Sequence, residues 1–323
     1  MNPLVSTVIP TRNRAALLGG AVRSALMQTD TSGKPISQEI IITDDSSTDN
    51  TPEIGRAFER EYPGVVRYMN VRTGSPGGTR NIGADAATAP FLAFLDDDDE
   101  WLAGRLQRAL DAFASHPGTA FIYGQTVPTN GDFEPAPESA PVFPPLPLVE
   151  GHPVAAFLRS PPHINTVLFR RELFLAHNGF DRTLSGFEDV DLLVRIVRRH
   201  ECFAVSEPLA RMRFHTDSLN GADKMWARFV DEQRSRRTHL RERDAFRPSF
   251  KERVLLSFGY RGWYVHRFLT IAAAANKVGN ALVAAKATHY ALRVSPLHAL
   301  KNPLFWQVRR SAKNAKNTKE QTV

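Results

Sequence analysis

The sequence has little that would place the protein outside the cytosol or within a membrane. Its 323 residues include one cysteine, Cys202, which excludes an internal disulfide and fits a reducing compartment. A membrane-spanning helix needs roughly 20 uninterrupted apolar residues. The best stretch, Phe268 to Ala275, stops at Asn276. No signal peptide is visible before the first strand-like residues, so we expect a cytoplasmic protein.

A recognisable nucleic-acid-binding module is also absent, although the formal net charge is +7. Much of the positive charge lies late, in Arg234-Ser235-Arg236-Arg237 and in the tail. We therefore expect an anionic substrate or surface as partner, and no nucleic acid. The segment Pro303–Arg310 mixes aromatic and basic residues, which favours peripheral contact with the inner face of the membrane. A solvated, partly disordered tail is nevertheless the interpretation that we expect, with membrane contact as its alternative.

Residues 1–220 alternate between strand-like and helix-like segments. An amphipathic helix is predicted over Ala15–Met27, and two more are predicted over Pro52–Tyr62 and Thr79–Ala87. The predicted strands are Val5–Ile9, Glu39–Thr43, Val65–Met69 and the apolar run that begins at Phe91. This alternation predicts an α/β fold with a mostly parallel sheet flanked by helices.

The second half of the chain changes character twice. Prolines crowd residues 126–162, which predicts an irregular excursion. Order should return with a strand over Thr166–Arg170 and a helix over Arg171–His177. Beyond Gly221 only helices are expected, over Met225–Arg243, Val254–Phe258 and an alanine-rich pair within Phe268–Leu292. We therefore expect a catalytic domain in residues 1–220 and a helical C-terminal extension with a basic tail in residues 221–323.

The strongest chemical signal is the run from Phe91 to Trp101, in which five apolar residues lead into four aspartates, Asp96 to Asp99. Adjacent carboxylates repel one another, and a divalent cation with oxygen ligands or a strong hydrogen-bond network would neutralise them. Strand alternation would place Asp96 and Asp98 on one side, so that one pair of aspartates shares a ligand. The alternative is an acidic turn in which Asp99 caps a helix that begins near Glu100.

A second acidic pair, Asp44 and Asp45, follows the apolar run Ile40–Ile42. Ligands of parallel sheets bind beyond the carboxyl ends of the strands, and two such ends could form one cleft. Carboxylates at that edge can accept hydrogen bonds from a ribose hydroxyl or a base N–H. The alternative is a polar turn in which Asp49 or Thr51 caps the next helix.

Several motifs occur in an order and spacing that resembles the family 2 glycosyltransferases. They are Val5 to Arg14, Asp44 to Thr51, Gly78 to Gly83, Phe94 to Trp101, Asn178 to Asp181, Gly186 to Leu192 and Arg211 to His215. The resemblance covers roughly the first 220 residues. It implies a GT-A (Rossmann-like) fold, a nucleotide-diphosphate sugar donor, a Mn²⁺ or Mg²⁺ cofactor and transfer with inversion. It also implies a glycan or lipid-linked hydroxyl acceptor in cell-surface glycan or polysaccharide biosynthesis.

The resemblance also implies roles for the matching residues. Asp45 reads the base with support from Asp44, and Arg80 lies near the base and diphosphate, an exposed arginine at a helix start being the alternative. In the D-x-D pattern, Asp96 meets the ribose and Asp98 the metal, but the aspartate between them allows the register to slip by one. The residues implied for the nucleotide sugar are Pro10, Thr11, Asn13, Asp44, Asp45, Arg80, Asp96, Asp97 and Arg213. Those implied for the metal are Asp98, Asp96 and His215.

Inverting transfer needs a base that takes the proton of the acceptor hydroxyl. The resemblance implies that Asp189 is this base, and the charge of neighbouring Glu188 would raise its pKa. The alternative is that both carboxylates only favour the positive end of the helix that they open. By position, His163 and Asn165 are expected on the acceptor side.

Two other functions stay open at this stage. A metal-dependent phosphotransferase or phosphatase would use one aspartate of the acidic run as a covalent nucleophile. It would need separate explanations for Asp44-Asp45 and Glu188-Asp189. A non-catalytic nucleotide-sugar-binding scaffold would retain donor binding without turnover.

Overall fold

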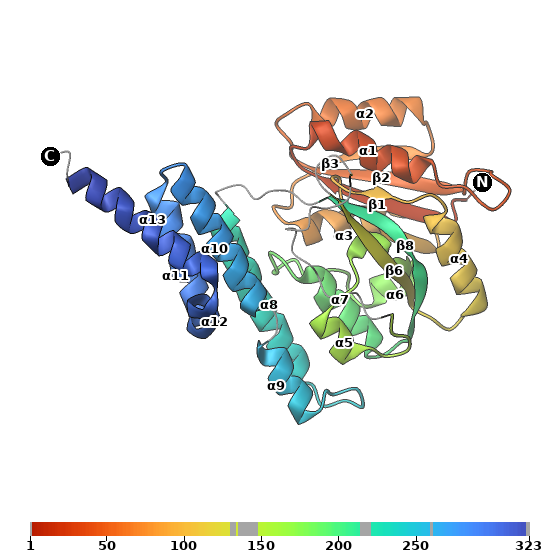
Figure 1. Cartoon of the computed structure of the whole chain (residues 1–323). Helices are drawn as coiled ribbons and strands as arrows, with labels where there is room; N and C mark the ends of the chain where they lie inside the picture. The colour runs from red at the N-terminus through yellow and green to blue at the C-terminus, as the bar shows by residue number, and fades with distance from the viewer. Residues whose placement is uncertain (1, 130–133, 135–147, 214–220, 259–260, 321–323) are drawn as a thin grey trace. The chain divides into compact units, whose positions relative to one another are not determined.

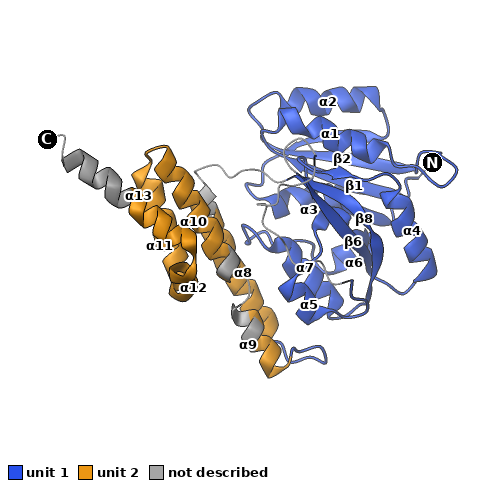
Figure 2. Ribbon diagram, viewed as in Figure 1, with its two compact units in different colours: residues 1–215, 242–248 blue, residues 216–241, 249–323 orange. Residues whose placement is uncertain are grey.

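The computed structural model of the protein describes residues 2–129, 134, 148–213, 221–258 and 261–320. The chain divides into two compact units (Figure 2). Unit 1 contains residues 1–215 and 242–248, and unit 2 contains residues 216–241 and 249–323. Each unit has its own buried apolar core.

Unit 1 is built on an eight-stranded sheet with the order β3-β2-β1-β4-β7-β6-β8-β5. β1 lies in parallel between β2 and β4, β2 pairs in parallel with β3, and β6 with β8. β7 runs antiparallel to β4 and β6, and β5 antiparallel to β8. The strands are β1 (Val5–Thr11), β2 (Gln38–Asp45), β3 (Val66–Val71), β4 (Phe91–Phe94), β5 (Glu100–Trp101), β6 (Phe121–Thr129), β7 (Leu168–Arg170) and β8 (Cys202–Arg213).

Helices cover both faces of this sheet, so its central strands are almost fully buried (Figure 1). Helices α1 and α4 pack in one apolar cluster with alternate residues of β1 and β2, such as Val5 and Ile40. Helices α3, α6 and α7 lie on the opposite face (Figure 1). The helices of unit 1 are α1 (Ala15–Leu26), α2 (Thr51–Glu61), α3 (Pro76–Ala86), α4 (Arg105–Ser115), α5 (Val154–Arg159), α6 (Arg171–Ala176) and α7 (Glu188–Val197). A 3₁₀ turn spans Ile164–Thr166.

The expected mostly parallel α/β sheet is confirmed, but some boundaries were wrong. Helix α3 begins at Pro76, because the Ser75 hydroxyl accepts a hydrogen bond from the Gly78 amide and caps the helix. The glycine-rich run is therefore the first helical turn. Within the stretch expected to be irregular, β6 continues to Thr129 and α5 spans Val154–Arg159. The sequence analysis also missed α4 and β8.

Unit 2 contains only helices among its described residues. They are α8 (Gly221–Arg241), α9 (Phe250–Phe258), α10 (Arg261–Lys277), α11 (Ala281–Val294), α12 (Pro296–Lys301) and α13 (Pro303–Glu320). The tail begins as a helix whose Phe305 and Val308 are buried in the unit's apolar clusters. The expectation of a solvated tail was therefore wrong for these positions. Among the described residues, no helix has the length and apolar character needed to cross a bilayer.

The packing of α3 against the sheet depends on a glycine. A Cβ at Gly83 would lie 2.4 Å from Cγ1 of Val8 on β1 and 3.1 Å from Cγ2 of Thr43 on β2. This close approach brings the start of α3, which carries Arg80, to the carboxyl edge of the sheet.

We expect Gly83→Ala to lower the free energy of unfolding by about 1–3 kcal/mol, because the added methyl group overpacks the α3 interface. The midpoint of urea unfolding measures the change. Gly118→Ala is the matched control, since a Cβ there meets nothing within 4 Å. It should change stability by no more than about 0.5 kcal/mol. Equal effects of the two substitutions would contradict the close packing of α3.

Candidate active site

Two loops at the carboxyl ends of β1 and β2 are bonded to one another. Oδ1 of Asn13 accepts a hydrogen bond from the amide of Thr48 at 2.8 Å, and the Asn13 amide donates to Oγ of Ser47 at 2.8 Å. Asn13 and Ser46 both have positive φ, 53° and 58°. Such conformations cost energy in residues other than glycine and cluster at functional sites. Asn13 therefore holds the two loops as one edge.

Asp44 and Asp45 have different partners at this edge. Asp44 is fully buried, and its carboxylate accepts hydrogen bonds from the Ser47 amide at 2.9 Å and the Tyr68 hydroxyl at 2.7 Å. Burial, with the bond to Asp44, raises the pKa of Tyr68 to about 12. Asp45 accepts hydrogen bonds from the Thr73 amide at 2.6 Å and from the Gly74 amide. Asp45 thus ties β2 to the segment that leads into α3.

The four aspartates form a turn, so the alternation expected for a strand was wrong. Strand β4 ends at Phe94, and the Asp99 amide donates to the Asp96 carbonyl at 3.2 Å. Asp96 and Asp99 consequently come together with His163, and one ligand atom from each lies within 4.8 Å of the others. The alternative, in which Asp99 caps a helix, is also excluded, because β5 follows and α4 begins only at Arg105.

The turn is held by Asn165, which is fully buried. Its Oδ1 accepts from the Asp96 amide at 2.9 Å, and its Nδ2 donates to Oδ2 of Asp99 at 2.5 Å. The carbonyl of Asn165 accepts from Nε1 of Trp101 at 2.8 Å and from Nη2 of Arg105 at 3.4 Å. Asn165 therefore positions the acidic turn. Its place in the sequence had suggested the acceptor side, but the side chain is fully buried and bonded within the protein.

Buried carboxylates of the turn resist ionisation. Burial raises the pKa of Asp99 to about 8, with the charges of Asp96 and Asp98 adding to the rise. Burial likewise raises the pKa of Asp97 to about 7, against the lowering effects of Thr11 and Arg14. The protein's own cations do not fully compensate this cluster, although Arg14 lies 3.9 Å from Asp97 and 3.6 Å from Asp98.

A divalent cation fits the arrangement of Asp96, Asp99 and His163. Nδ1 of His163 is buried and has no hydrogen-bond partner among the residues that the structure describes, so its lone pair or N–H is unused by them. Carboxylate oxygens and imidazole nitrogen are both donors for divalent metal ions. Of the residues predicted for the metal, Asp96 belongs to this group, Asp98 contacts Arg14, and His215 lies outside the described residues.

Arg80 connects the acidic turn to α7. Its Nη2 donates to Oδ1 of Asp96 at 2.6 Å, and its Nη1 donates to Oε1 of Glu188 at 2.8 Å. Burial alone would lower the pKa of Arg80, but the charges of Asp96 and Glu188 outweigh this effect and raise it. Arg80 is only 7% exposed, so the alternative interpretation of Arg80 as an exposed residue at a helix start is excluded.

The start of α7 is fixed by contacts with α3. The side chain of Asn81 donates to the Phe180 carbonyl at 2.8 Å and accepts from the Phe180 amide at 2.9 Å. Phe187, directly before α7, has a φ of 71°, a conformation that is rare for a bulky residue. Glu188 is buried against Arg80, whereas the half-buried Asp189 accepts a hydrogen bond only from the adjacent Val190 amide among the described contacts. Asp189 is therefore the less engaged of the two carboxylates.

The predicted nucleotide residues converge at this edge. Pro10 and Thr11 end β1, and the Arg213 amide at the end of β8 donates to Oδ1 of Asp99 at 2.7 Å. No role was predicted for Arg14, and Asn165 was predicted to lie on the acceptor side. The apolar run before Asp96 had no feature pointing to Asn165, which lies 69 positions away in the chain.

The mostly parallel sheet, with carboxylates and a buried arginine at its carboxyl edge, defines an α/β protein of the kind whose ligands bind at that edge. The sequence profile described as Glycosyl transferase family 2 matches residues 6–175. The protein belongs to this family. Its described fold matches GT-A glycosyltransferase structures.

Curated relatives match in part. A GalNAc(5)-diNAcBac-PP-undecaprenol beta-1,3-glucosyltransferase of Campylobacter jejuni is 33% identical over 38% of this chain and 38% of its own length. An uncharacterized glycosyltransferase of Haemophilus influenzae is 26% identical over 66% of this chain and 69% of its own length. This chain therefore matches only about a third of the length of some relatives, 38% of the Campylobacter protein and 32% of an uncharacterized glycosyltransferase of Nostoc.

Solved structures match over almost the whole chain. The mannosyltransferase PcManGT of Pyrobaculum calidifontis, in complex with GDP-Man and Mn²⁺, has a TM-score of 0.59 and 19% identity, covering 97% of this chain and 86% of that one. S. aureus TarS 1–349 in complex with UDP-GlcNAc has a TM-score of 0.57 and 14% identity, covering 98% of this chain and 92% of that one. At these identities the likeness concerns the fold alone.

The raised pKa values of Asp97 and Asp99 predict how stability depends on pH. In the folded protein the pKa is about 7 for Asp97 and about 8 for Asp99, whereas the pKa of an unperturbed aspartate is 3.8. The contribution of these two groups to folding stability is therefore complete below pH 3.8 and is lost as the pH rises through their pKa values in the folded protein. In chelator, the melting temperature should fall between about pH 4 and about pH 8. A fall of the same size in Asp97→Asn/Asp99→Asn would contradict this assignment.

Asn165→Ala should lower the free energy of unfolding in chelator by about 1–3 kcal/mol, because the Asp96 amide and the Asp99 carboxylate lose a buried partner. His163→Ala is the contrast, since Nδ1 of His163 makes no hydrogen bond to any described residue. It should leave stability in chelator nearly unchanged and reduce the stabilisation by Mn²⁺. Urea unfolding with and without Mn²⁺ measures both effects. Equal losses in chelator would contradict the positioning role of Asn165.

Proposed function

We propose that the protein is a metal-dependent inverting glycosyltransferase that moves a sugar from a nucleotide-diphosphate sugar to a hydroxyl acceptor. The observation that carries this proposal is the buried Arg80, which bridges Asp96 of the acidic turn and Glu188 of α7. A single side chain thus connects the residues implied for the donor to those implied for the base. The family membership and the GT-A fold support the same reaction.

The edge formed by β1 and β2 would bind the nucleotide. Asp44 has both carboxylate oxygens engaged within the protein, which suits a supporting role. Asp45 lies beside it near the Arg12 guanidinium, at 3.6 Å, and would accept a hydrogen bond from the base. Asn13, Pro10 and Thr11 would form the wall of this site.

The cation would be held by carboxylates of the turn, Asp96 with Asp99 or Asp98, and by His163. Mn²⁺ or Mg²⁺ bound there would supply positive charge for the departing diphosphate. Arg80 would add a fixed, always protonated charge nearby. Since Arg80 is already paired with Asp96 and Glu188, it is oriented before the donor binds.

Asp189 would accept the proton of the acceptor hydroxyl as that oxygen attacks the anomeric carbon. It lies in the first turn of α7, next to the buried Glu188. Glu188 would position this turn through Arg80. Asp189 keeps its own carboxylate accessible, since it is half-buried and makes no ion pair among the described residues.

The acceptor class is inferred from the relatives. One relative is a glucosyltransferase whose printed name gives a PP-undecaprenol substrate, and another is a minor teichoic acid biosynthesis protein of Bacillus subtilis. We therefore propose a glycan or lipid-linked hydroxyl acceptor and a role in cell-surface polysaccharide biosynthesis. The cytoplasmic location expected from the sequence would give access to soluble nucleotide sugars.

A thermal-shift panel tests the proposal. The purified chain is heated with UDP, GDP and their sugar conjugates, each with Mn²⁺, Mg²⁺ or chelator, because a ligand of the folded state raises the melting temperature. Stabilisation by one nucleotide only in the presence of metal supports the proposal and identifies the donor class. Stabilisation by none of them would contradict it and favour the phosphotransferase alternative.

Asp189→Asn should reduce sugar transfer by about 100-fold or more, because the base is lost. It should retain the metal-dependent thermal shift. Asp99→Asn should instead weaken that shift, since it removes a carboxylate that lies beside Asp96 and His163. Asp111→Asn, an exposed aspartate of α4, is the matched control and should change neither readout. Full transfer by Asp189→Asn would show that another residue is the base.

A further inference from the structure

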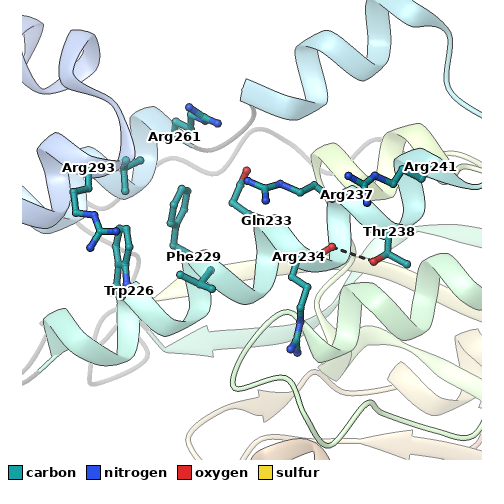
Figure 3. Close-up of a pocket in the computed structure, with 11 residues that line it drawn as sticks. Trp226, Phe229, Gln233, Arg234, Arg237, Thr238, Arg241, Arg261 and Arg293 are labelled. Atoms are coloured by element: carbon teal, nitrogen blue, oxygen red, sulfur yellow. Dashed lines mark hydrogen bonds between the residues drawn. The ribbon is translucent and has the colours of Figure 1, made fainter.

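A basic cavity lies within unit 2, among residues of α8, α10 and α11 (Figure 3). Its volume is about 460 Å³. Five arginines contribute to its lining, together with the aromatic side chains of Trp226 and Phe229. The arginines are Arg234, Arg237, Arg241, Arg261 and Arg293.

The positive charge of this cavity is not neutralised by its own lining. None of the eleven described residues that line it is acidic. Arg237 and Arg241 are exposed, and neither makes an ion pair with any described residue. Arg293 packs over the Trp226 ring, with its guanidinium carbon 4.7 Å from the ring centroid. Arg234 lies 3.6 Å from the carboxylate of Asp231, three residues earlier on α8.

Helical spacing brings these cations together. Arg234, Arg237 and Arg241 lie three and four residues apart on α8, which places them on one face of the helix. Arg261 and Arg293 come from the beginning of α10 and the end of α11. Like charges at this spacing destabilise a helix, so the arrangement costs energy unless an anion offsets it.

The chemistry of the lining selects the ligand. Guanidinium groups donate paired hydrogen bonds that match the oxygens of phosphate esters. The Thr238 hydroxyl and the Gln233 amide add polar groups at the same cavity. A volume of about 460 Å³ exceeds that of one phosphate group and leaves room for a diphosphate with part of its ester. The Trp226 and Phe229 rings offer an apolar wall to that part.

We propose that this cavity is a binding site for the phosphate or diphosphate group of an organic phosphate. The site goes beyond the proposed transfer reaction, because all of its lining residues belong to unit 2 and none belongs to the acidic edge of unit 1. Two sources share this chemistry, a phospholipid or lipid-diphosphate headgroup and a soluble organic phosphate.

The test uses the full chain and the double variant Arg237→Gln/Arg241→Gln. Both side chains are exposed, so their replacement should not lower the melting temperature of the free protein. Arg310→Gln in α13 is the matched control, since Arg310 is exposed and outside the cavity. The first probe is inorganic pyrophosphate in chelator, followed by calorimetric titration. The second is sedimentation with phosphatidylglycerol vesicles, compared with phosphatidylcholine vesicles.

We expect the double variant to bind pyrophosphate or phosphatidylglycerol vesicles at least about tenfold more weakly than the wild type, and Arg310→Gln to differ by less than about twofold. Loss confined to pyrophosphate identifies a soluble phosphate as the source, and loss on vesicles identifies a headgroup. If both variants lost the same small amount of affinity, the loss would reflect the change in net charge alone, and the proposal would be overturned. Absence of binding to either probe by the wild type would also overturn it.

The thermal-shift panel separates this site from the proposed active site. The double variant should retain the metal-dependent stabilisation by a nucleotide sugar, because Arg237 and Arg241 do not belong to the carboxylate edge. If that stabilisation disappeared together with pyrophosphate binding, the cavity would not be an independent site, and the proposal would be overturned. If the wild type showed no thermal shift with any nucleotide but still bound pyrophosphate, the proposed transfer reaction would be contradicted and the cavity proposal would not.

Discussion

The buried guanidinium of Arg80 is the interaction on which the rest of the site depends. A buried charge without partners is costly, and removal of one partner of a buried pair leaves the other uncompensated. Arg80 has two partners, Asp96 from the loop after β4 and Glu188 from α7. Because these come from distant parts of the chain, the ion pairs join the sheet edge to α7. The position of Asp189 follows from this connection, since it is adjacent to Glu188 in the same helical turn.

The acidic turn beside Arg80 contains more negative charge than the protein neutralises. Asn165 keeps Asp96 and Asp99 in place by hydrogen bonds, but an amide supplies no charge. Burial therefore raises the pKa values of Asp97 and Asp99 to about 7 and about 8. A rigid carboxylate cluster that resists ionisation is a site prepared for a cation. Nδ1 of His163, at the same place, has no hydrogen-bond partner in the described part of the chain, which agrees with this interpretation.

Unit 2 presents the opposite imbalance. The described lining of its cavity includes five arginines and no carboxylate, just as the turn of unit 1 gathers carboxylates. In both places like charges are brought together by local structure, a helix face in one and a tight turn in the other. Local structure of this kind is retained most easily when a ligand of opposite charge binds. The formal net charge of +7 conceals these two opposed sites.

The sequence by itself determined the elements with a local signal. Apolar runs that end in Asp44-Asp45 and Asp96–Asp99 identified the strands and the acidic edge, and the order of the motifs indicated the family. Only the tertiary structure decided which carboxylates meet. Asp96 joins Asp99 because β4 ends early, and Asn165 joins both across 69 and 66 positions of the chain. Glu188 is paired with Arg80 across 108 positions. Such contacts depend on chain folding over long separations, and neither residue spacing nor side-chain alternation carries that information.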